Sequence, residues 1–532
     1  MSVMWKKLVW ICLVGLVGAW PCSAEVLRFG THVSAMGRLD PHFAFGSQDR
    51  ALADMVFNGL LRYLPGRAPK IGPDLAEALP EFRMEGGEQI WTIRLRKGVM
   101  FHEAPGLPAH ELTAEDVVFS LEKSADKARS GYSGDYLDME VVLRSRYQVE
   151  IRFAHPISPI LFFPRIANYG GGFIVSKQAV ETLGYEGFKT HPVGTGPFAF
   201  DSHSPGEVLK LKAHAAYFRG APKLDGVWLY FQPEAALRLA ALKAGELDVI
   251  TGSGKKGWID QARALEEVVV DTHGVGEVGV FHLNTTTPPF DDIRVRRALA
   301  HALDREAFYR TTDADIVDRV FSPIPAPYLP GGLKRQEVEV LGLAYEYDVE
   351  KARALLREAG LEAGFDLELV ASEKRLYQAY YQTLKAQLAP LNIRCNIETV
   401  PHSQMHRIIR STPPPIVLYP AWRPNADVYL TRFFHSDSRV VTGRRPDTNF
   451  SQYQSVDALI DAARREVDPD AQIRLWSQAQ IRILHDMVAF PVMATRQIYV
   501  RRMAVDYGHP VVSTMALYPQ FTERTQIRSG GK

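Results

Sequence analysis

The segment Gly279–Arg305, GVFHLNTTTPPFDDIRVRRALAHALDR, joins a strand to a helix near the middle of the chain. Val280–Leu283 predicts a short strand, which Pro288 and Pro289 end because proline lacks the N–H group that strand pairing needs. Asp291 or Asp292 can cap the helix that follows. Apolar residues recur in that helix at i, i+3, i+4, i+7 and i+8, namely Val295, Ala298, Leu299, Ala302 and Leu303. We therefore expect the chain to cross here from one lobe of a two-lobed protein to the other.

The first 24 residues predict an export signal. Lys6 and Lys7 form a positive start, and Leu8–Trp20 is an uncharged apolar run of thirteen residues. Cys22 and Ala24 place small residues at the −3 and −1 positions of a cleavage site. The apolar run is shorter than the roughly 20 residues that span a bilayer. We expect cleavage after Ala24 and a soluble exported protein that begins at Glu25.

Charge and cysteine content narrow the function classes. Loss of Lys6 and Lys7 lowers the 62 Lys and Arg residues by two, to 60, against 61 Asp and Glu, which is a net charge of −1. A nearly neutral chain argues against nucleic acid or an anionic membrane as a partner. Of three cysteines only Cys395 would remain, so the exported protein would have no internal disulfide. Its stability would come from core burial, for which 46% hydrophobic residues suffice.

Several motifs flank the central segment. Trp91, Ile93 and Leu95 alternate with polar residues as in a half-buried strand, and Thr113 with Asp116 is typical of a capping box. Other motifs are His191–Phe198 (HPVGTGPF), Gly245–Ile250 (GELDVI) and Leu112–Glu122 (LTAEDVVFSLE). Together with the central segment they resemble family 5 of the extracellular solute-binding proteins, which deliver peptides, nickel chelates and other solutes to ABC importers. The loop His102–Glu111 is longer than that of the family.

Residues 365–397 predict an α/β unit on their own pattern. One strand is predicted by the alternating residues Phe365, Leu367 and Leu369, and a second by Ile393, Cys395 and Ile397. Between them, a helix is predicted by an apolar face made of Leu376, Tyr380, Leu384 and Leu388. Strand, helix and strand with short joins predict a parallel crossover. Cys395 is then expected to be a core residue.

The resemblance implies an α/β fold, a two-lobed clamshell of the periplasmic-binding-protein type with an additional subdomain inserted in the first lobe. The first lobe would comprise residues 25–70, 191–278 and 496–532, and the inserted subdomain residues 71–190. The second lobe would comprise residues 279–495. Ligand would be enclosed between the lobes by hinge closure.

The sequence does not predict a catalytic or cofactor site. Gly252–Gly257 fits G-x-G-x-x-G but lies far from the start of a βαβ unit, and no Ser or Thr follows Lys256 as in a phosphate loop. No G-x-S-x-G serine elbow is present. His402 and His406 are spaced i, i+4, which keeps a metal chelate open as an alternative cargo. We expect no catalysis, no cofactor and no metal ligand; a secreted α/β hydrolase is the less favoured alternative.

Two arguments select the binding residues. Open α/β sheets bind ligands beyond the carboxyl ends of strands, which selects the predicted loop 420–430 after the strand that ends at Tyr419. The resemblance places the family's recognition loop on Trp422, Arg423, Asn425 and Asp427. It also places Ser47 and Asp49, from the loop 45–49, at the cleft. In the peptide binders the first Asp of that loop pairs with the ligand's amino group, and here that position is Asn425. Either Asp427 takes its place or the cargo lacks a free amine and Arg423 meets a carboxylate.

The resemblance therefore implies a periplasmic substrate-binding component of an ABC importer. It would act as a monomer that captures a short peptide or peptide-like solute and delivers it to permease subunits in the inner membrane. A nickel or other metal chelate and an oligosaccharide are the alternative cargoes.

Overall fold

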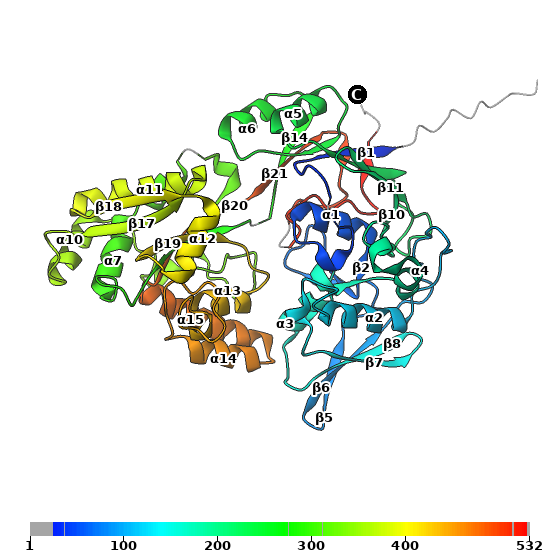
Figure 1. The fold of residues 1–532 in the computed structure, drawn as a ribbon, viewed down its shortest axis with the longest axis horizontal. Helices are drawn as coiled ribbons and strands as arrows, with labels where there is room; N and C mark the ends of the chain where they lie inside the picture. Colours follow the sequence, from blue (N-terminus) through cyan, green and yellow to red (C-terminus); the bar gives the residue numbers. More distant parts are fainter. Residues whose placement is uncertain (1–24, 37, 275, 311, 513–514, 529–532) are drawn as a thin grey trace, which may run out of the picture.

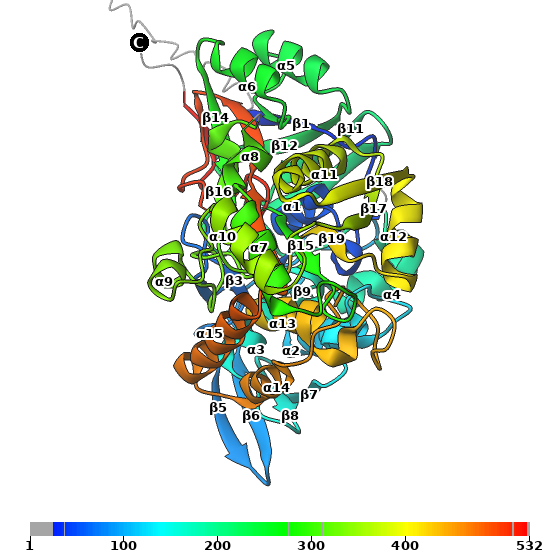
Figure 2. The same ribbon diagram turned by 90° about the vertical axis from the view of Figure 1, so that its left-hand side faces the viewer.

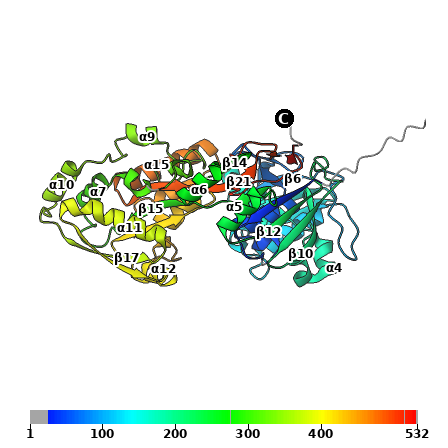
Figure 3. The same cartoon turned by 90° about the horizontal axis from the view of Figure 1, so that it is seen from above.

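A computed structural model describes residues 25–528 except 37, 275, 311, 513 and 514. The predicted signal segment, residues 1–24, lies outside this part. The chain forms two bodies side by side, joined where β14, β21 and β20 meet (Figure 1). The view from above shows the same division (Figure 3). Within the described residues, none of the helices is both long and apolar enough to cross a membrane.

A seven-stranded sheet forms the centre of the first body, in the order β10-β11-β12-β1-β13-β21-β14. Its strands are β1 (Val26–Thr31), β10 (Phe198–Ser204), β11 (Val208–Ala213), β12 (Gly226–Phe231), β13 (Val249–Thr251), β14 (Val268–His273) and β21 (Gln497–Arg502). β1 is parallel to β12 and β13, whereas β21 runs antiparallel to β13 and β14. The sheet thus combines the start, the middle and the end of the described chain. Helices α1 (Ser47–Val56), α5 (Ala235–Lys243) and α6 (Lys256–Arg263) belong to the same body.

Residues 71–190 contribute a second sheet, in the order β5-β6-β8-β7. Its elements are β5 (Glu81–Glu85), β6 (Glu88–Arg94), β7 (Glu140–Ser145) and β8 (Gln148–Phe153), with α2 (Ala114–Ala125), α3 (Pro159–Phe162) and α4 (Lys177–Phe188) beside them. The β5–β6 hairpin projects from the molecule (Figures 1 and 2). The capping box is confirmed, since Asp116 accepts from the backbone N–H of Thr113 at 2.9 Å. Trp91, Ile93 and Leu95 are buried in one hydrophobic cluster with Phe29 and Leu27 of the seven-stranded sheet. The inserted segment therefore shares its core with the first body.

The central segment predicted from the sequence organises the second body. β15 (Val278–Leu283) is buried at every residue and pairs with β19 (Ile416–Ala421) on one side and β20 (Ala489–Thr495) on the other. Asp292 caps α7 (Ile293–Ala302) by accepting from the Arg294 N–H at 2.8 Å. All five residues of the predicted stripe are at most 2% exposed. Strand, cap and helix are confirmed.

The predicted α/β unit is present with one correction. β17 (Asp366–Ser372) and β18 (Arg394–Val400) pair in parallel, with α11 (Arg375–Leu388) between them in the chain. Leu376 is 42% exposed, so its place in the buried stripe was wrong. The other three predicted residues, Tyr380, Leu384 and Leu388, are buried, and Tyr377 and Tyr381 complete the buried face in place of Leu376. Cys395 is buried, and burial raises the pKa of its thiol to about 11.

The remaining elements complete the second body. They are β16 (Val317–Arg319), α8 (Arg305–Tyr309), α9 (Arg335–Val340), α10 (Val349–Glu358), α12 (His402–Ser411), α13 (Ala426–Phe434), α14 (Asp457–Arg465) and α15 (Pro469–His485). Short pairs elsewhere are β2 (Asn58–Gly59) with β9 (Phe173–Ile174), β3 (Leu61–Tyr63) with β4 (Ile71–Pro73), and β22 (Val505–Asp506) with β23 (Gln526–Ile527). The chain leaves the first body after β14 and returns through β20 and β21.

His282 in β15 is a buried neutral histidine. Neither ring nitrogen has a hydrogen-bond partner among the described residues, and the ring lies 5.2 Å from that of Phe433. Burial, followed by the charge of Arg423, lowers the pKa of His282 to about 3. In the unfolded chain this histidine has a pKa near 6.5, so below that pH it binds a proton that it does not bind in the folded chain. His282 therefore reduces the free energy of unfolding as pH falls from about 6.5 toward 3.

We predict that His282→Phe removes this dependence. Between pH 6.5 and 5 its free energy of unfolding should fall less steeply than that of the wild type, with a slope difference that rises to about 1.4 kcal/mol per pH unit near pH 5. At pH 7 the variant should be at least as stable, because an apolar ring replaces two unpaired polar atoms. Urea unfolding at pH 5, 5.75, 6.5 and 7 measures both quantities. Parallel pH curves for the two proteins would contradict the prediction.

Candidate functional site

The predicted binding loop is shorter than expected. Pro420 and Ala421 belong to β19, and α13 begins at Ala426, so only Trp422–Asn425 are loop. The predicted loop 420–430 was wrong at both ends. Asn425 starts the helix earlier because its side chain accepts from the backbone N–H of Val428 at 2.9 Å.

Trp422 lies against the first body. Its ring centre is 6.0 Å from that of Tyr169, and the Arg50 guanidinium lies 5.6 Å from the Trp422 ring and 4.7 Å from the Tyr169 ring. The indole Nε1 is buried and has no acceptor among the described residues. Arg50 and Trp422 therefore bring side chains of both bodies together around Tyr169.

A second contact joins the inserted segment to the second body. Ser158 donates its hydroxyl to Gln472 Oε1 at 2.6 Å, and both side chains are fully buried. Beside it lies a mostly apolar hollow of about 200 Å³. Its lining comes from both bodies: Tyr63, Pro69, Ile71, Leu79, Pro159, Ile160, Phe163, Pro164, Leu329, Pro330, Pro424 and Asn425. The recognition loop thus borders an apolar space as well as the aromatic contact at Trp422.

Two polar residues of the predicted loop are engaged within the fold. Asn425 is the helix cap described above. Asp427 lies in the first turn of α13 and forms an ion pair with Arg464 at 3.1 Å. Desolvation raises the pKa of Asp427, while Arg464 opposes that rise. The prediction that Asp427 meets a ligand amine is not tested by this arrangement, but Asp427 already has a cationic partner.

Arg423 has no such partner. One guanidinium nitrogen donates to the Trp422 carbonyl at 3.0 Å, and the group lies 4.9 Å from the centre of the Phe433 ring. Its Nε is buried without an acceptor. Among the described residues, Arg423 has no carboxylate within 4.0 Å. A ligand carboxylate would satisfy both the charge and the N–H geometry.

Glu277 was missed by the sequence analysis. It precedes β15, and because Val278 pairs with Ala421, Glu277 stands opposite Trp422 and next to Arg423 in the strand register. Its side chain is exposed, yet desolvation by the surrounding protein raises the pKa of its carboxyl, against the lowering by Arg423 and Lys374. Only the strand register places this residue at the recognition loop, so its position in the sequence carried no signal of its own.

The other predicted residues border this region. Tyr419 in β19 accepts a hydrogen bond at its hydroxyl from Arg410 at 3.0 Å. Asp49 and Ser47 lie in the first turn of α1, where Asp49 accepts from the Gly46 N–H at 3.1 Å. Burial raises the pKa of Asp49, while that hydrogen bond and Arg50 act in the opposite direction. Through Arg50, the start of α1 adjoins the contact at Trp422.

The histidine pair lies on α12. The Nε2 atoms of His402 and His406 are 3.1 Å apart, and Arg410 contacts the other ring nitrogen of His406 at 2.9 Å. Burial, then His402 and Arg410, lower the pKa of His406 to about 4. Across the described residues there is no group of three or more His, Cys, Asp and Glu side chains placed to hold a metal ion. A metal cargo would therefore have to bring most of its own ligands.

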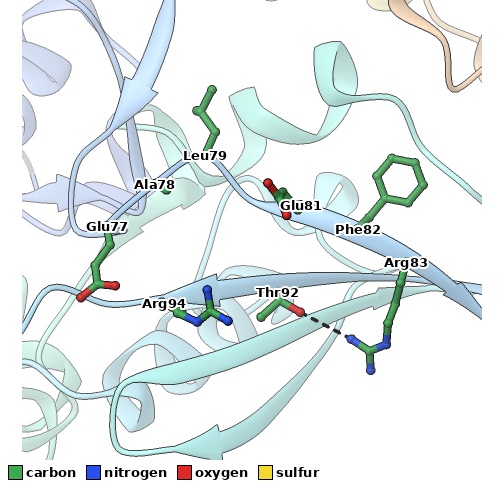
Figure 4. A pocket seen from close by; sticks show the side chains of 8 residues that line it. All are labelled: Glu77, Ala78, Leu79, Glu81, Phe82, Arg83, Thr92 and Arg94. Atoms are coloured by element: carbon green, nitrogen blue, oxygen red, sulfur yellow. Dashed lines mark hydrogen bonds between the residues drawn. The ribbon is translucent and has the colours of Figure 1, made fainter.

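Two other features do not resemble ligand sites. A hollow of about 330 Å³ lies on the projecting β5–β6 hairpin, where Arg83 and Thr92 interact at 3.4 Å (Figure 4). Its lining residues all come from the inserted segment. Ser124 contacts His42 at 3.2 Å, but both side chains are buried and Ser124 donates to the Gly171 carbonyl at 2.7 Å. These buried polar groups stabilise the first body and lack access for a substrate.

Comparison with known proteins identifies relatives over nearly the whole chain. The model of bacterial extracellular solute-binding proteins, family 5 Middle, matches residues 70–439. The dipeptide-binding protein of Escherichia coli (strain K12) is 26% identical over 521 residues, which cover 92% of each chain. The structure of MoaA from A. tumefaciens R10, in complex with mannopinic acid, is 35% identical with a TM-score of 0.74. It covers 95% of this chain and all of that one. DppA from Helicobacter pylori, in complex with the peptide STSA, is 22% identical with a TM-score of 0.72, covering 95% and 99% of the two chains.

We predict that Asp427→Asn lowers the free energy of unfolding by about 1–3 kcal/mol, because it leaves Arg464 without its closest carboxylate partner. This loss is smaller than the loss expected for a fully buried ion pair, because the side chain of Arg464 is 36% exposed. Asp461→Asn is the matched control: Asp461 lies 3.8 Å from the same arginine but is 44% exposed. It should change the free energy by less than about 0.5 kcal/mol. A loss of less than about 0.5 kcal/mol for Asp427→Asn in urea unfolding, as in the control, would contradict this structural role.

Proposed function

Because the chain belongs to family 5 of the bacterial extracellular solute-binding proteins, we propose that it captures a solute between its two lobes and delivers it to the permease of an ABC importer. The cargo is a short peptide or a peptide-like compound. The observation that carries the proposal is the recognition loop, which holds Trp422 against Tyr169 and Arg50 of the other body. In the same loop Arg423 has no acidic partner within 4.0 Å among the residues that the structure describes.

We propose the lobe boundaries predicted above, with residues 279–495 as the second lobe. Sheet membership supports them, because β20 pairs within the second body and β21 within the first. The shared core of residues 71–190 with the first body supports an insertion. Closure would turn the lobes about the crossing at residues 276–277 and 495–496.

The ligand-binding residues we propose are those around the recognition loop: Trp422, Arg423, Asn425, Asp427, Tyr419, Asp49 and Ser47. Tyr419 and Trp422 would supply stacking surface, and Arg423 a bidentate donor for a carboxylate. Two relatives suggest the range of cargo: the Escherichia coli protein is named for dipeptides, and MoaA was solved with mannopinic acid. Peptide-like acids therefore belong among the solutes to be tested.

The same family membership supports the proposed location and partners. The protein would be periplasmic, exported by the cleavable segment 1–24, and would act as a monomer that meets inner-membrane permease subunits when closed. It would not be an enzyme. A metal chelate is the second candidate cargo, favoured by the His402–His406 pair alone.

We predict that binding stabilises the protein and leaves the ligand intact. A ligand at 100 times its Kd should raise the free energy of unfolding by about 2.7 kcal/mol. The probes are short peptides with their N-acetylated forms, acidic amino-acid derivatives, nickel–histidine complexes and oligosaccharides, followed by thermal shift and by mass spectrometry of the recovered probe. Consumption of a probe would establish the hydrolase alternative. Stabilisation by nickel complexes alone, lost in His406→Ala, would establish the metal alternative.

Closure should also change the fluorescence of Trp422. We expect ligand to alter the emission of the wild type and of Trp228→Phe, and to leave that of Trp422→Phe nearly unchanged. Trp228 lies in β12 of the seven-stranded sheet, away from the recognition loop, and is the matched control. The same ligand response in both variants would place binding elsewhere.

The exported protein should begin at Glu25. N-terminal sequencing of protein recovered from the periplasm tests this directly. Retention of residues 1–24, or a lipid on Cys22, would contradict the proposed soluble periplasmic form.

A further inference from the structure

We propose that Glu277 and Arg423 form a two-charge subsite for an amino-acid head group, with Glu277 accepting from the ammonium and Arg423 donating to the carboxylate on the same carbon. The inference rests on the proposed function and specifies the class of solute: an amino acid, free or carrying a substituent on its amine. The widely separated termini of a peptide would not satisfy both groups at once.

The strand register brings the backbones of the two residues close together. Val278 and Ala421 are partners in the antiparallel pair β15–β19, so the next residues, Glu277 and Trp422, stand opposite each other and Arg423 follows. The backbone of Glu277 is fixed from the other side, because its carbonyl accepts from the Thr495 N–H at 3.2 Å. Both residues therefore stand at one edge of the second body, where the chain crosses to the first.

The two charges interact without neutralising each other. The charge of Arg423 acts to lower the pKa of the Glu277 carboxyl, which desolvation raises, yet in the described chain neither residue has an opposite charge within 4.0 Å. The Glu277 side chain is exposed. A ligand head group that carries both an ammonium and a carboxylate would supply a partner to each of two opposite charges that are not paired with each other.

Arg423 is positioned for a carboxylate before any ligand arrives. Its contacts with the Trp422 carbonyl and the Phe433 ring hold the guanidinium in place. The buried Nε still lacks an acceptor. A planar guanidinium held in this way loses little conformational freedom when it binds a carboxylate in a bidentate manner.

Among the described residues, three neighbouring charged groups are already engaged, whereas Lys374 also acts on Glu277 and lowers its pKa. Asp427 pairs with Arg464, and Asp49 accepts from the Gly46 N–H. Arg410 contacts Tyr419 and His406. Across the contact at Trp422, Arg50 has no acidic partner within 4.0 Å among the described residues and lies over Tyr169. A second carboxylate on the solute, as in glutamate, would suit Arg50.

The test uses three glutamate probes and one peptide. N-methyl-L-glutamate carries the complete head group, N-acetyl-L-glutamate lacks the charged amine, and L-glutamic acid α-amide lacks the α-carboxylate. Trialanine carries both charges on separate residues. Affinities are measured by calorimetry for the wild type, Glu277→Gln and Arg423→Gln. Glu373→Gln, an exposed glutamate next to Lys374, is the matched control.

We expect the wild type to bind N-methyl-L-glutamate at least tenfold more tightly than either incomplete probe or trialanine. Glu277→Gln should weaken the complete probe at least tenfold and abolish its advantage over the N-acetyl form. Arg423→Gln should abolish its advantage over the α-amide. Glu373→Gln should leave every affinity within twofold of the wild type.

Equal binding of the complete and N-acetyl probes by the wild type would overturn the inference. So would preferred binding of trialanine that Glu277→Gln leaves unchanged, and in that case the proposed function would stand. Failure of all these probes and of the wider panel to bind would instead contradict the proposed function itself. Circular dichroism of each variant confirms that a lost affinity does not reflect unfolding.

Discussion

The hydrogen-bonded crossing between the bodies is the constraint on which the other features depend. Gly276 donates to the Thr495 carbonyl at 2.5 Å, and Thr495 donates to the Glu277 carbonyl at 3.2 Å. A Cβ on Gly276 would lie 2.6 Å from the Thr495 oxygen, so the close approach requires glycine. This pairing joins the β14–β21 ladder of one sheet to the β15–β20 ladder of the other. The two segments therefore cross as one ribbon, and Glu277 and the recognition loop keep a defined position relative to it.

Helix α13 determines which side chains of the recognition loop remain available to a solute. Its first turn exposes unsatisfied N–H groups, and the Asn425 side chain satisfies one of them. Asp427 lies in the first turn of the helix, where its carboxylate is largely desolvated. Without Arg464 its negative charge would destabilise the fold. Both polar groups thus contribute to the local fold. In the proposed site, the charges left for a solute are those of Arg423 and of Glu277, which precedes β15.

The two bodies meet through contacts of different chemistry. At Trp422 the contact is aromatic and cationic, with Tyr169 and Arg50 on the other side. At Ser158 and Gln472 it is a buried hydrogen bond next to an apolar hollow. Aromatic surfaces accept many partners, whereas a buried hydrogen bond is directional. In the proposed function, the aromatic contact at Trp422 would hold a solute. The hydrogen bond between Ser158 and Gln472 would keep the two lobes aligned.

Local patterns determined much of this protein. The stripe from Val295 to Leu303, the cap at Asp292 and the alternation through Cys395 were all predicted, because periodicity and capping depend on neighbours in the sequence. So was the central place of β15, through its resemblance to a known family. Where a local pattern allowed two solutions, as at Leu376 and Tyr377, packing against the sheet chose between them. The partners of Asp427 and the place of Glu277 were decided only by the tertiary structure. Arg464 is distant in sequence from Asp427, and Trp422 is distant from Glu277. An ion pair or a strand register between distant segments has no signature in either segment alone.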